Sequence, residues 1–193
     1  MDTTRVSLLL RIKDRQDASA WREFDAIYRP MLRKFALAYG ADATEAEDVV
    51  QHCMTAIHEH IDRFEYDPAK GRFKGWLKTL VNNRIRNLLR KRRERVARTG
   101  EFAAIPADSD DDPESLFEKI WLDQHLRHAL KLVRREVEEK TFNAFVDYVI
   151  RERPVEEICA EYNLNPNQVH KSKYRLTKKL AEKMATLTGE ASP

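Results

Sequence analysis

Arginine, asparagine and threonine side chains recur at helical spacing between Phe73 and Arg95, in the segment FKGWLKTLVNNRIRNLLRKRRER. On a helix, these polar residues share one side and the apolar residues share the other. The polar stripe is Thr79, Asn83, Arg86, Arg90 and Arg93; the apolar stripe is Leu77, Leu80, Val81, Ile85 and Leu88. Guanidinium and amide groups donate hydrogen bonds to phosphate oxygens and to base edges. The pattern predicts a helix with a buried half and a nucleic-acid-binding half; the alternative is a solvated basic face.

A second set of candidate binding residues lies near the C-terminus, in the segment PVEEICAEYNLNPNQVHKSKYRLTKKL at 154–180. Pro154 suits the first turn of a helix, Asn163 tolerates the left-handed conformation of a turn, and Asn165 suits the N-cap of a second helix. The candidate DNA-binding residues on that second helix are Asn167, His170, Lys171, Tyr174 and Arg175. This layout predicts a helix-turn-helix whose second helix enters the major groove; an ordinary helical hairpin with a charged outer face is the alternative.

A third candidate surface is acidic. A helix that begins at Thr44, with Glu47 as its capping-box partner, would gather Glu47, Asp48, Gln51 and Thr55 on one face. The sequence offers these residues no obvious basic partner. Such a face is usually solvated, and the functional alternative is a protein partner that carries arginines.

The sequence argues against a catalytic or metal-binding role. His52, Cys53, His58 and His60 are potential zinc ligands, but helical geometry directs His58 and His60 to nearly opposite faces. There is no glycine-rich phosphate loop, no nucleophile elbow and no paired-carboxylate arrangement. We therefore expect no enzyme activity, no catalytic residue, no metal and no cofactor.

The elements that position these residues are predicted to be helices throughout. The chain has 193 residues, of which only five are glycine, and no segment shows the alternation of a strand. Residues 99–113, TGEFAAIPADSDDDP, are polar, acidic and without periodicity. We predict an all-α fold with two small helical domains, 1–98 and 114–186, joined by an acidic flexible linker at 99–113 and followed by a tail at 187–193.

The charge distribution indicates a polyanionic partner. The net charge is only +3, but basic residues crowd 84–98 and 171–183, and an acidic block at 108–114 separates them. Cys53 and Cys159 lie in apolar segments, and the N-terminus resembles neither a signal peptide nor a membrane span. We therefore predict a cytoplasmic protein without disulfides or membrane contact.

Taken in order, these parts resemble an extracytoplasmic-function (ECF) sigma factor, the small two-domain class of bacterial transcription initiation factors. The resemblance covers about residues 21–184. Its most specific pieces are AEDVVQ at 46–51, FKGWLKTLVNN at 73–83 and the helix-turn-helix segment at 154–180.

The resemblance implies that core RNA polymerase and promoter DNA are partners, with an anti-sigma factor as a further possible partner. It implies that Glu47, Asp48, Gln51 and Thr55 bind the clamp helices of the polymerase. It also implies that the loop at 64–75 captures a flipped-out base of the minus-ten promoter element. The residues implied to serve the minus-ten element are Phe73, Trp76, Asn83, Arg86, Asn87 and Arg90; those implied to read the minus-thirty-five element are Asn167, His170, Lys171, Tyr174 and Arg175. Phe73 and Trp76 would line or buttress the base pocket.

Two other functions compete with this interpretation. A helix-turn-helix regulator that acts without polymerase would explain the C-terminal domain, but it leaves the acidic face and the arginine stripe without a role. A helical RNA-binding or scaffolding protein would show no preference for a two-element promoter over random duplex at matched salt concentration.

Overall fold

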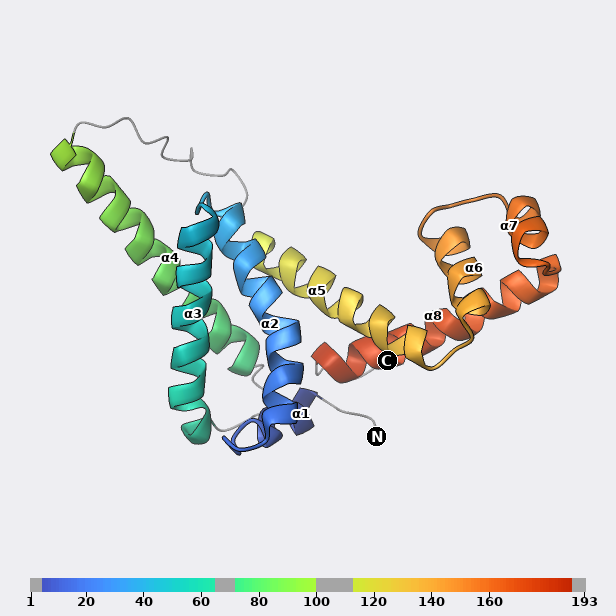
Figure 1. The fold of residues 1–193 in the computed structure, drawn as a ribbon, viewed down its shortest axis with the longest axis horizontal. Coiled ribbons are helices and arrows are strands. Elements are labelled where there is room, and N and C mark those ends of the chain that lie inside the picture. Colours follow the sequence, from blue (N-terminus) through green and yellow to red (C-terminus); the bar gives the residue numbers. More distant parts are fainter. Residues whose placement is uncertain (1–4, 65–71, 100–112, 189–193) are drawn as a thin grey trace. The chain divides into compact units, whose positions relative to one another are not determined.

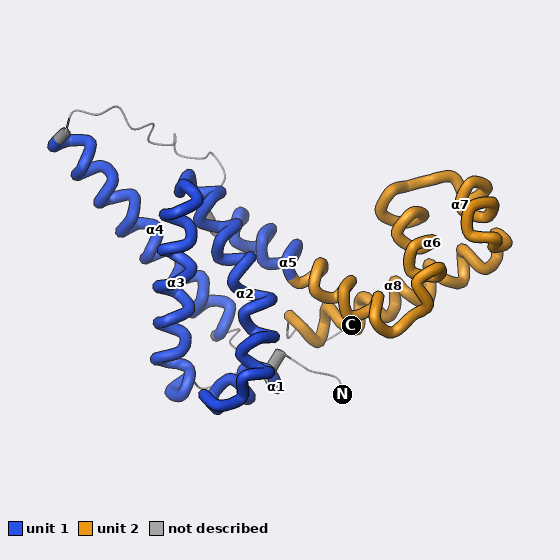
Figure 2. The backbone as a smooth tube through the Cα atoms, in the orientation of Figure 1, with its two compact units in different colours: residues 1–124 blue, residues 125–193 orange. Residues whose placement is uncertain are grey.

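The structure is a computed structural model that describes residues 5–64, 72–99 and 113–188 (Figure 1). Over these ranges the chain forms α-helices, one short 3-10 helix (η1) and no strand, which confirms the all-α prediction. The elements are α1 (Arg5–Arg11), α2 (Ala18–Ala38), α3 (Ala43–His60), η1 (Ile61–Arg63), α4 (Arg72–Thr99), α5 (Pro113–Arg135), α6 (Glu139–Val149), α7 (Val155–Tyr162) and α8 (Pro166–Thr188). The chain divides into two compact units, residues 1–124 and 125–193 (Figure 2).

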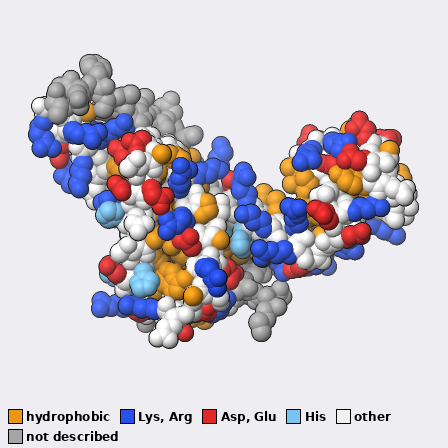
Figure 3. Space-filling view, in the orientation of Figure 1, with side chains coloured by type: hydrophobic (Ala, Val, Ile, Leu, Met, Phe, Trp, Pro, Cys, Tyr) orange, Lys and Arg blue, Asp and Glu red, His pale blue; other side chains and the backbone are white. Residues whose placement is uncertain are grey.

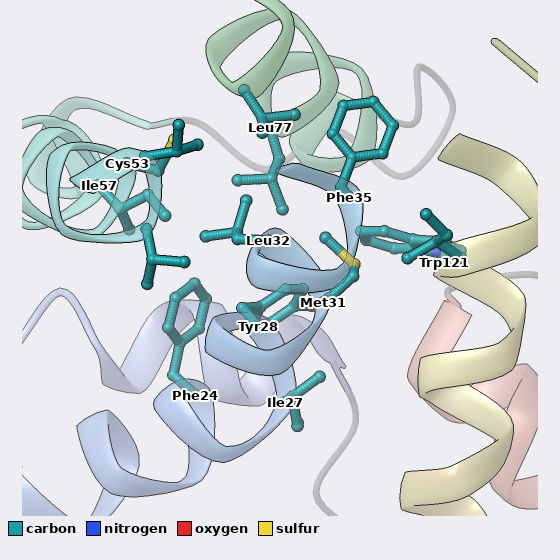
Figure 4. Packing of buried hydrophobic residues seen from close by; sticks show 14 of the residues in the cluster. Phe24, Ile27, Tyr28, Met31, Leu32, Phe35, Cys53, Ile57, Leu77 and Trp121 are labelled. Carbon is teal, nitrogen blue, oxygen red and sulfur yellow. The ribbon is translucent and has the colours of Figure 1, made fainter. Parts of the chain in front are cut away.

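Helix α2 forms the centre of the first unit, because its apolar residues cover more than one side of the helix. The fully buried side chains of α2 include Phe24, Ile27, Tyr28, Met31, Leu32 and Phe35. Figure 4 shows them beside Cys53 and Ile57 of α3, Leu77 of α4 and Trp121 of α5. The helices that carry the two candidate surfaces, α3 and α4, are thus fixed by one shared apolar core.

Helix α3 begins at Ala43, one residue before the predicted start, and its N-cap lies two residues before the predicted cap, which changes the role of Glu47. Asp42 is the N-cap: its carboxylate accepts hydrogen bonds from the backbone N–H groups of Thr44 (2.9 Å) and Glu45 (2.8 Å). The side chain of Glu45 accepts from the backbone N–H of Asp42 and completes the capping box. The predicted capping box of Thr44 and Glu47 is therefore wrong, because an aspartate two residues earlier already satisfies the first free N–H groups. Glu47 has no capping role and lies on the surface.

The first unit extends beyond the predicted domain boundary. The predicted linker at 99–113 lies almost wholly outside the described residues, but the N-terminal half of α5 belongs to the first unit. Phe117 and Trp121, four residues apart, are buried in that core, and the ring of Phe117 lies 5.4 Å from the ring of Phe35. Leu122 and Leu126, which the apolar spacing assigns to the inner side of this helix, are 47% and 40% exposed. The aromatic residues therefore set the buried side of α5 in the first unit.

The second unit is built on two small apolar clusters that share α6 and α8. Val133, Phe142, Phe145 and Leu176 form one cluster, and Ala144, Ile158 and Val169 form the other. Val169 and Leu176 are seven residues apart, so they lie on the same side of α8. The opposite side of α8 is thereby left to solvent.

The turn between α7 and α8 has the conformation that its asparagines predict. Asn163 adopts the left-handed conformation (φ 48°, ψ 58°) at the end of α7. Asn165 caps α8: its side chain accepts from the backbone N–H of Gln168 at 2.9 Å, and the side chain of Gln168 accepts from the backbone N–H of Asn165 at 2.8 Å. The first turn of α8 is therefore held by reciprocal side-chain hydrogen bonds.

A buried carboxylate connects α6 to α7. Asp147 is 1% exposed and accepts hydrogen bonds from Arg151 (2.6 Å), Arg153 (2.8 Å) and the hydroxyl of Tyr162 (2.9 Å). Burial acts to raise the pKa of Asp147, but these three donors outweigh it and hold the pKa below its ordinary value. The ionised carboxylate therefore stabilises the loop that sets the position of α7.

We expect Asp147→Asn to destabilise the second unit by about 2–4 kcal/mol at pH 7, because it removes a buried, hydrogen-bonded charge. A depressed folded-state pKa contributes stability above the ordinary carboxyl pKa of about 4, and this contribution is lost as the pH falls. The difference between variant and parent should therefore shrink below about pH 4. Hydrogen exchange of the α6 and α7 amides measures both effects. Glu157→Gln, which removes only an exposed partner of Arg153, is the control, with an expected change below about 0.5 kcal/mol.

Candidate nucleic-acid and protein interfaces

The predicted polar stripe lies on the outer side of α4. Thr79, Asn83, Arg86, Arg90 and Arg93 are all exposed, whereas Leu77, Val81 and Ile85 are buried in the first unit. Asn87, the remaining predicted minus-ten residue on this helix, is exposed as well. Figure 3 shows lysine and arginine side chains gathered over the C-terminal half of α4. The predicted division of this helix into a buried and a cationic half is confirmed.

Two arginines of the same cluster face inward, one toward the middle of α3 and the other toward the segment that precedes it. Nη2 of Arg84 lies 3.1 Å from Nδ1 of His52, and Nη1 of Arg92 donates to the carbonyl oxygen of Gly40 at 3.1 Å. Both side chains are half-buried. The basic run therefore has two roles: some arginines attach α4 to the rest of the unit, and others remain on the surface. The spacing of these arginines in the sequence does not distinguish the two roles.

A groove of about 480 Å³ separates the N-terminal part of α3 from the C-terminal part of α4. Its walls carry both signs of charge, with Glu45, Asp48 and Glu94 among the acids and Arg84, Lys91 and Arg95 among the cations. The acidic surface of α3 and the basic surface of α4 thus adjoin. Two oppositely charged partners could be held next to each other here.

The predicted acidic face, formed by Glu47, Asp48, Gln51 and Thr55, is exposed along α3. One expectation about it is wrong: Glu47 has an internal basic partner, since Nη1 of Arg29 donates to Oε1 of Glu47 at 2.7 Å. Arg29 belongs to α2, so its ion pair with Glu47 forms only when α2 and α3 pack together. Arg29 also contacts Asp25 within α2. For Asp48, the described residues supply no ion pair within 4.0 Å. An external cation that binds Asp48 therefore does not have to displace a basic side chain of the described residues.

The aromatic residues at the start of α4 differ in exposure. Phe73 is 1% exposed and lies against Tyr28, with 5.4 Å between ring centroids, so it has no surface to offer a base. Trp76 is partly exposed, and its ring lies 5.6 Å from that of Phe64 and 5.8 Å from that of Phe73. Residues 65–71, the larger part of the predicted base-capturing loop, lie outside the described residues. Of the two candidates, Trp76 can contact a base and Phe73 can only support it.

The predicted contact residues of the second unit lie on the solvent side of α8. Asn167, His170, Lys171, Tyr174 and Arg175 are all exposed, and Tyr174 is 75% exposed. His170 is also in contact with α6, where its ring lies 5.6 Å from that of Tyr148. Lys171 and Arg175 border a groove of about 470 Å³, whose opposite wall includes Lys140 and Thr141 of α6.

The lysines farther along α8 have a structural role. Lys179 and Lys183 contact the carboxylate of Glu136 at 2.7 and 2.8 Å. Hydrogen bonds from these two ammonium groups lower the pKa of Glu136 to about 2. The basic run at 171–183 is thus divided in the same way as that of α4: its N-terminal part is available to a ligand, and these two lysines are paired within the unit.

The structure gives no support to a metal site in the ranges it describes. Within them, no three histidine, cysteine, aspartate or glutamate side chains lie together so that they could hold an ion. Cys53 is buried, and this burial raises the pKa of its thiol to about 12, although the charge of Arg84 acts in the opposite direction. In the described part of the chain, no helix has both the length and the apolar character needed to cross a bilayer.

Comparison with known proteins shows similarity to sigma factors. Residues 26–95, from α2 to the cationic part of α4, match the family described as sigma-70 region 2. The chain is 28% identical, over 177 residues, to the ECF RNA polymerase sigma factor RpoE of Cereibacter sphaeroides. That match covers 90% of this chain and 91% of the relative, so it includes both compact units.

Proposed function

We propose that the chain is an ECF sigma factor, the promoter-specificity subunit of an RNA polymerase, with no catalytic activity of its own. The match of residues 26–95 to sigma-70 region 2 and the similarity to RpoE along both units support this proposal. In this role it binds core polymerase through α3, recognises and melts the minus-ten element through α4, and reads the minus-thirty-five element through α8.

The observation that carries the proposal is the presence of opposite charges on adjoining helices of one unit. An acidic face suits a protein partner with exposed cations, and a stripe of amides and guanidinium groups suits a nucleic acid. Asp48 and the exposed Lys91 of α4 line the same groove, so polymerase and DNA would meet along this line. A regulator that binds only duplex DNA has no use for the acidic face.

Each part of α4 suits a different step of minus-ten recognition. Trp76 is partly exposed, so an unstacked base can lie against it, and Phe73 supports it from the core. Asn83 and Asn87 offer amides to base edges, while Arg86 and Arg90 offer cations to the phosphates of the separated strands. Arg90 pairs with Glu94 at 3.0 Å in the free protein, an exposed contact that costs little to exchange for a phosphate.

Run-off transcription with purified core polymerase tests the proposal. On a template pool with random upstream DNA, we expect chain-dependent transcripts whose start sites lie at a fixed distance from a shared two-element sequence. Core alone provides the baseline. A transcript pattern that does not change when the chain is added would overturn the proposal, and it would favour a regulator that acts without polymerase.

A further inference from the structure

The guanidinium of Arg29 joins two carboxylates at the edge of the acidic face. Its Nη1 donates to Oε1 of Glu47 at 2.7 Å, and its Nε lies 3.0 and 3.2 Å from the two carboxylate oxygens of Asp25. All three side chains are between about one third and one half exposed: Arg29 is 36%, Asp25 43% and Glu47 53%. The contact to Glu47 is therefore in reach of a partner protein.

We propose that Arg29 is an internal competitor that sets how tightly the acidic face binds its partner. A cationic side chain of that partner would have to take Glu47 from Arg29, whereas Asp48, which has no ion pair in the described part of the chain, needs no such exchange. This inference rests on the proposed function of the α3 face, because it concerns the strength of that same contact.

The exchange is made easy by Asp25. Since Nε of Arg29 remains bound to Asp25, four residues earlier on the same helix, Arg29 can release Glu47 without leaving the surface uncompensated. Both contacts are exposed, so each has the modest strength of a surface ion pair. Arg29 therefore lowers the affinity for the partner by a small factor and does not block binding.

Binding of the full-length chain to core polymerase at low salt tests this, with four proteins: the parent, Arg29→Gln, Glu47→Gln and the double variant. We expect Arg29→Gln to bind about two- to fivefold more tightly than the parent, which is the range of one exposed ion pair. In the Glu47→Gln background, the same substitution should have no effect, because the contested carboxylate is gone. Arg29→Lys, which keeps the charge but loses the forked geometry, should fall between parent and Arg29→Gln.

Arg33→Gln is the matched control, since Arg33 is exposed one turn farther along α2 and its substitution removes the same charge. An equal gain for Arg33→Gln, or a gain that persists without Glu47, would mean a general charge effect and overturn the proposal. Weaker or unchanged binding of Arg29→Gln would also overturn it. If the parent itself failed to bind core polymerase, the proposed function would fail instead, so the two failures are distinguishable. Circular dichroism confirms that each variant is folded.

Discussion

Asp48→Lys is expected to reduce the affinity for core polymerase by about 30-fold or more, the effect of reversing a charge at the centre of a charged interface. Asp48 is exposed, without an ion pair in the described part of the chain, and on the same face as Gln51 and Thr55. A lysine there would repel the cationic partner and would also lie beside Arg84 in the groove. Binding is measured with labelled full-length chain and purified core.

The control for this variant is Glu59→Lys. Eleven residues separate Glu59 from Asp48, so both lie on nearly the same side of α3, about 16 Å apart along the helix. The charge change is equal, and a lysine near the C-terminal end of a helix is favourable. We expect this control to bind core nearly as well as the parent. Assembly of Asp48→Lys with core at unaltered affinity would refute the assignment of this face to the polymerase.

Lys171→Ala and Arg175→Ala are expected to weaken promoter binding by the holoenzyme about 10-fold each if the side chain contacts a base edge. A side chain that contacts phosphate should instead lower the slope of log affinity against log salt by about 0.9. Both residues are exposed on α8 and border the groove beside α6. Equilibrium binding across a salt series, on a promoter that the holoenzyme has selected from random DNA, separates the two modes.

Lys173→Ala is the control for these variants. Lys173 is only two residues from Lys171, but on a helix it points to the opposite side, and its ammonium lies 5.2 Å from the ring of Tyr148. Its removal should leave both the affinity and the salt slope close to the parent values. On a template whose minus-thirty-five element is scrambled, any base-specific effect of Lys171→Ala or Arg175→Ala should vanish. Parental affinity and salt slope for both variants would contradict the assigned role of α8.

Several features of this protein follow from its sequence alone, because they depend on residues that are near one another in the chain. A period of 3.6 residues fixes which side of a helix is buried. It therefore predicts that Asn83 and Arg86 face solvent while Val81 does not. The left-handed conformation at Asn163 and the cap at Asn165 also follow, since both depend on local backbone chemistry.

The start of α3 shows the limit of this local reasoning. Asp42 and Thr44 are both good N-cap residues, and each has a glutamate three residues later. The sequence offers two overlapping capping boxes, and the choice between them depends on how α2 and α3 are connected. In the structure, Gly40 takes a positive φ of 78°, and α3 begins directly after Asp42.

The tertiary structure alone decided which side chains meet across helices. It pairs Arg29 with Glu47, turns Arg84 and Arg92 inward while Arg86 stays outside, and buries Phe73 while Trp76 keeps exposed surface. It also places Phe117 and Trp121 in the core of the first unit. Periodicity gives the direction of a side chain from its own helix axis, but a contact between helices depends on their separation and crossing angle, which only the packing of the whole core determines.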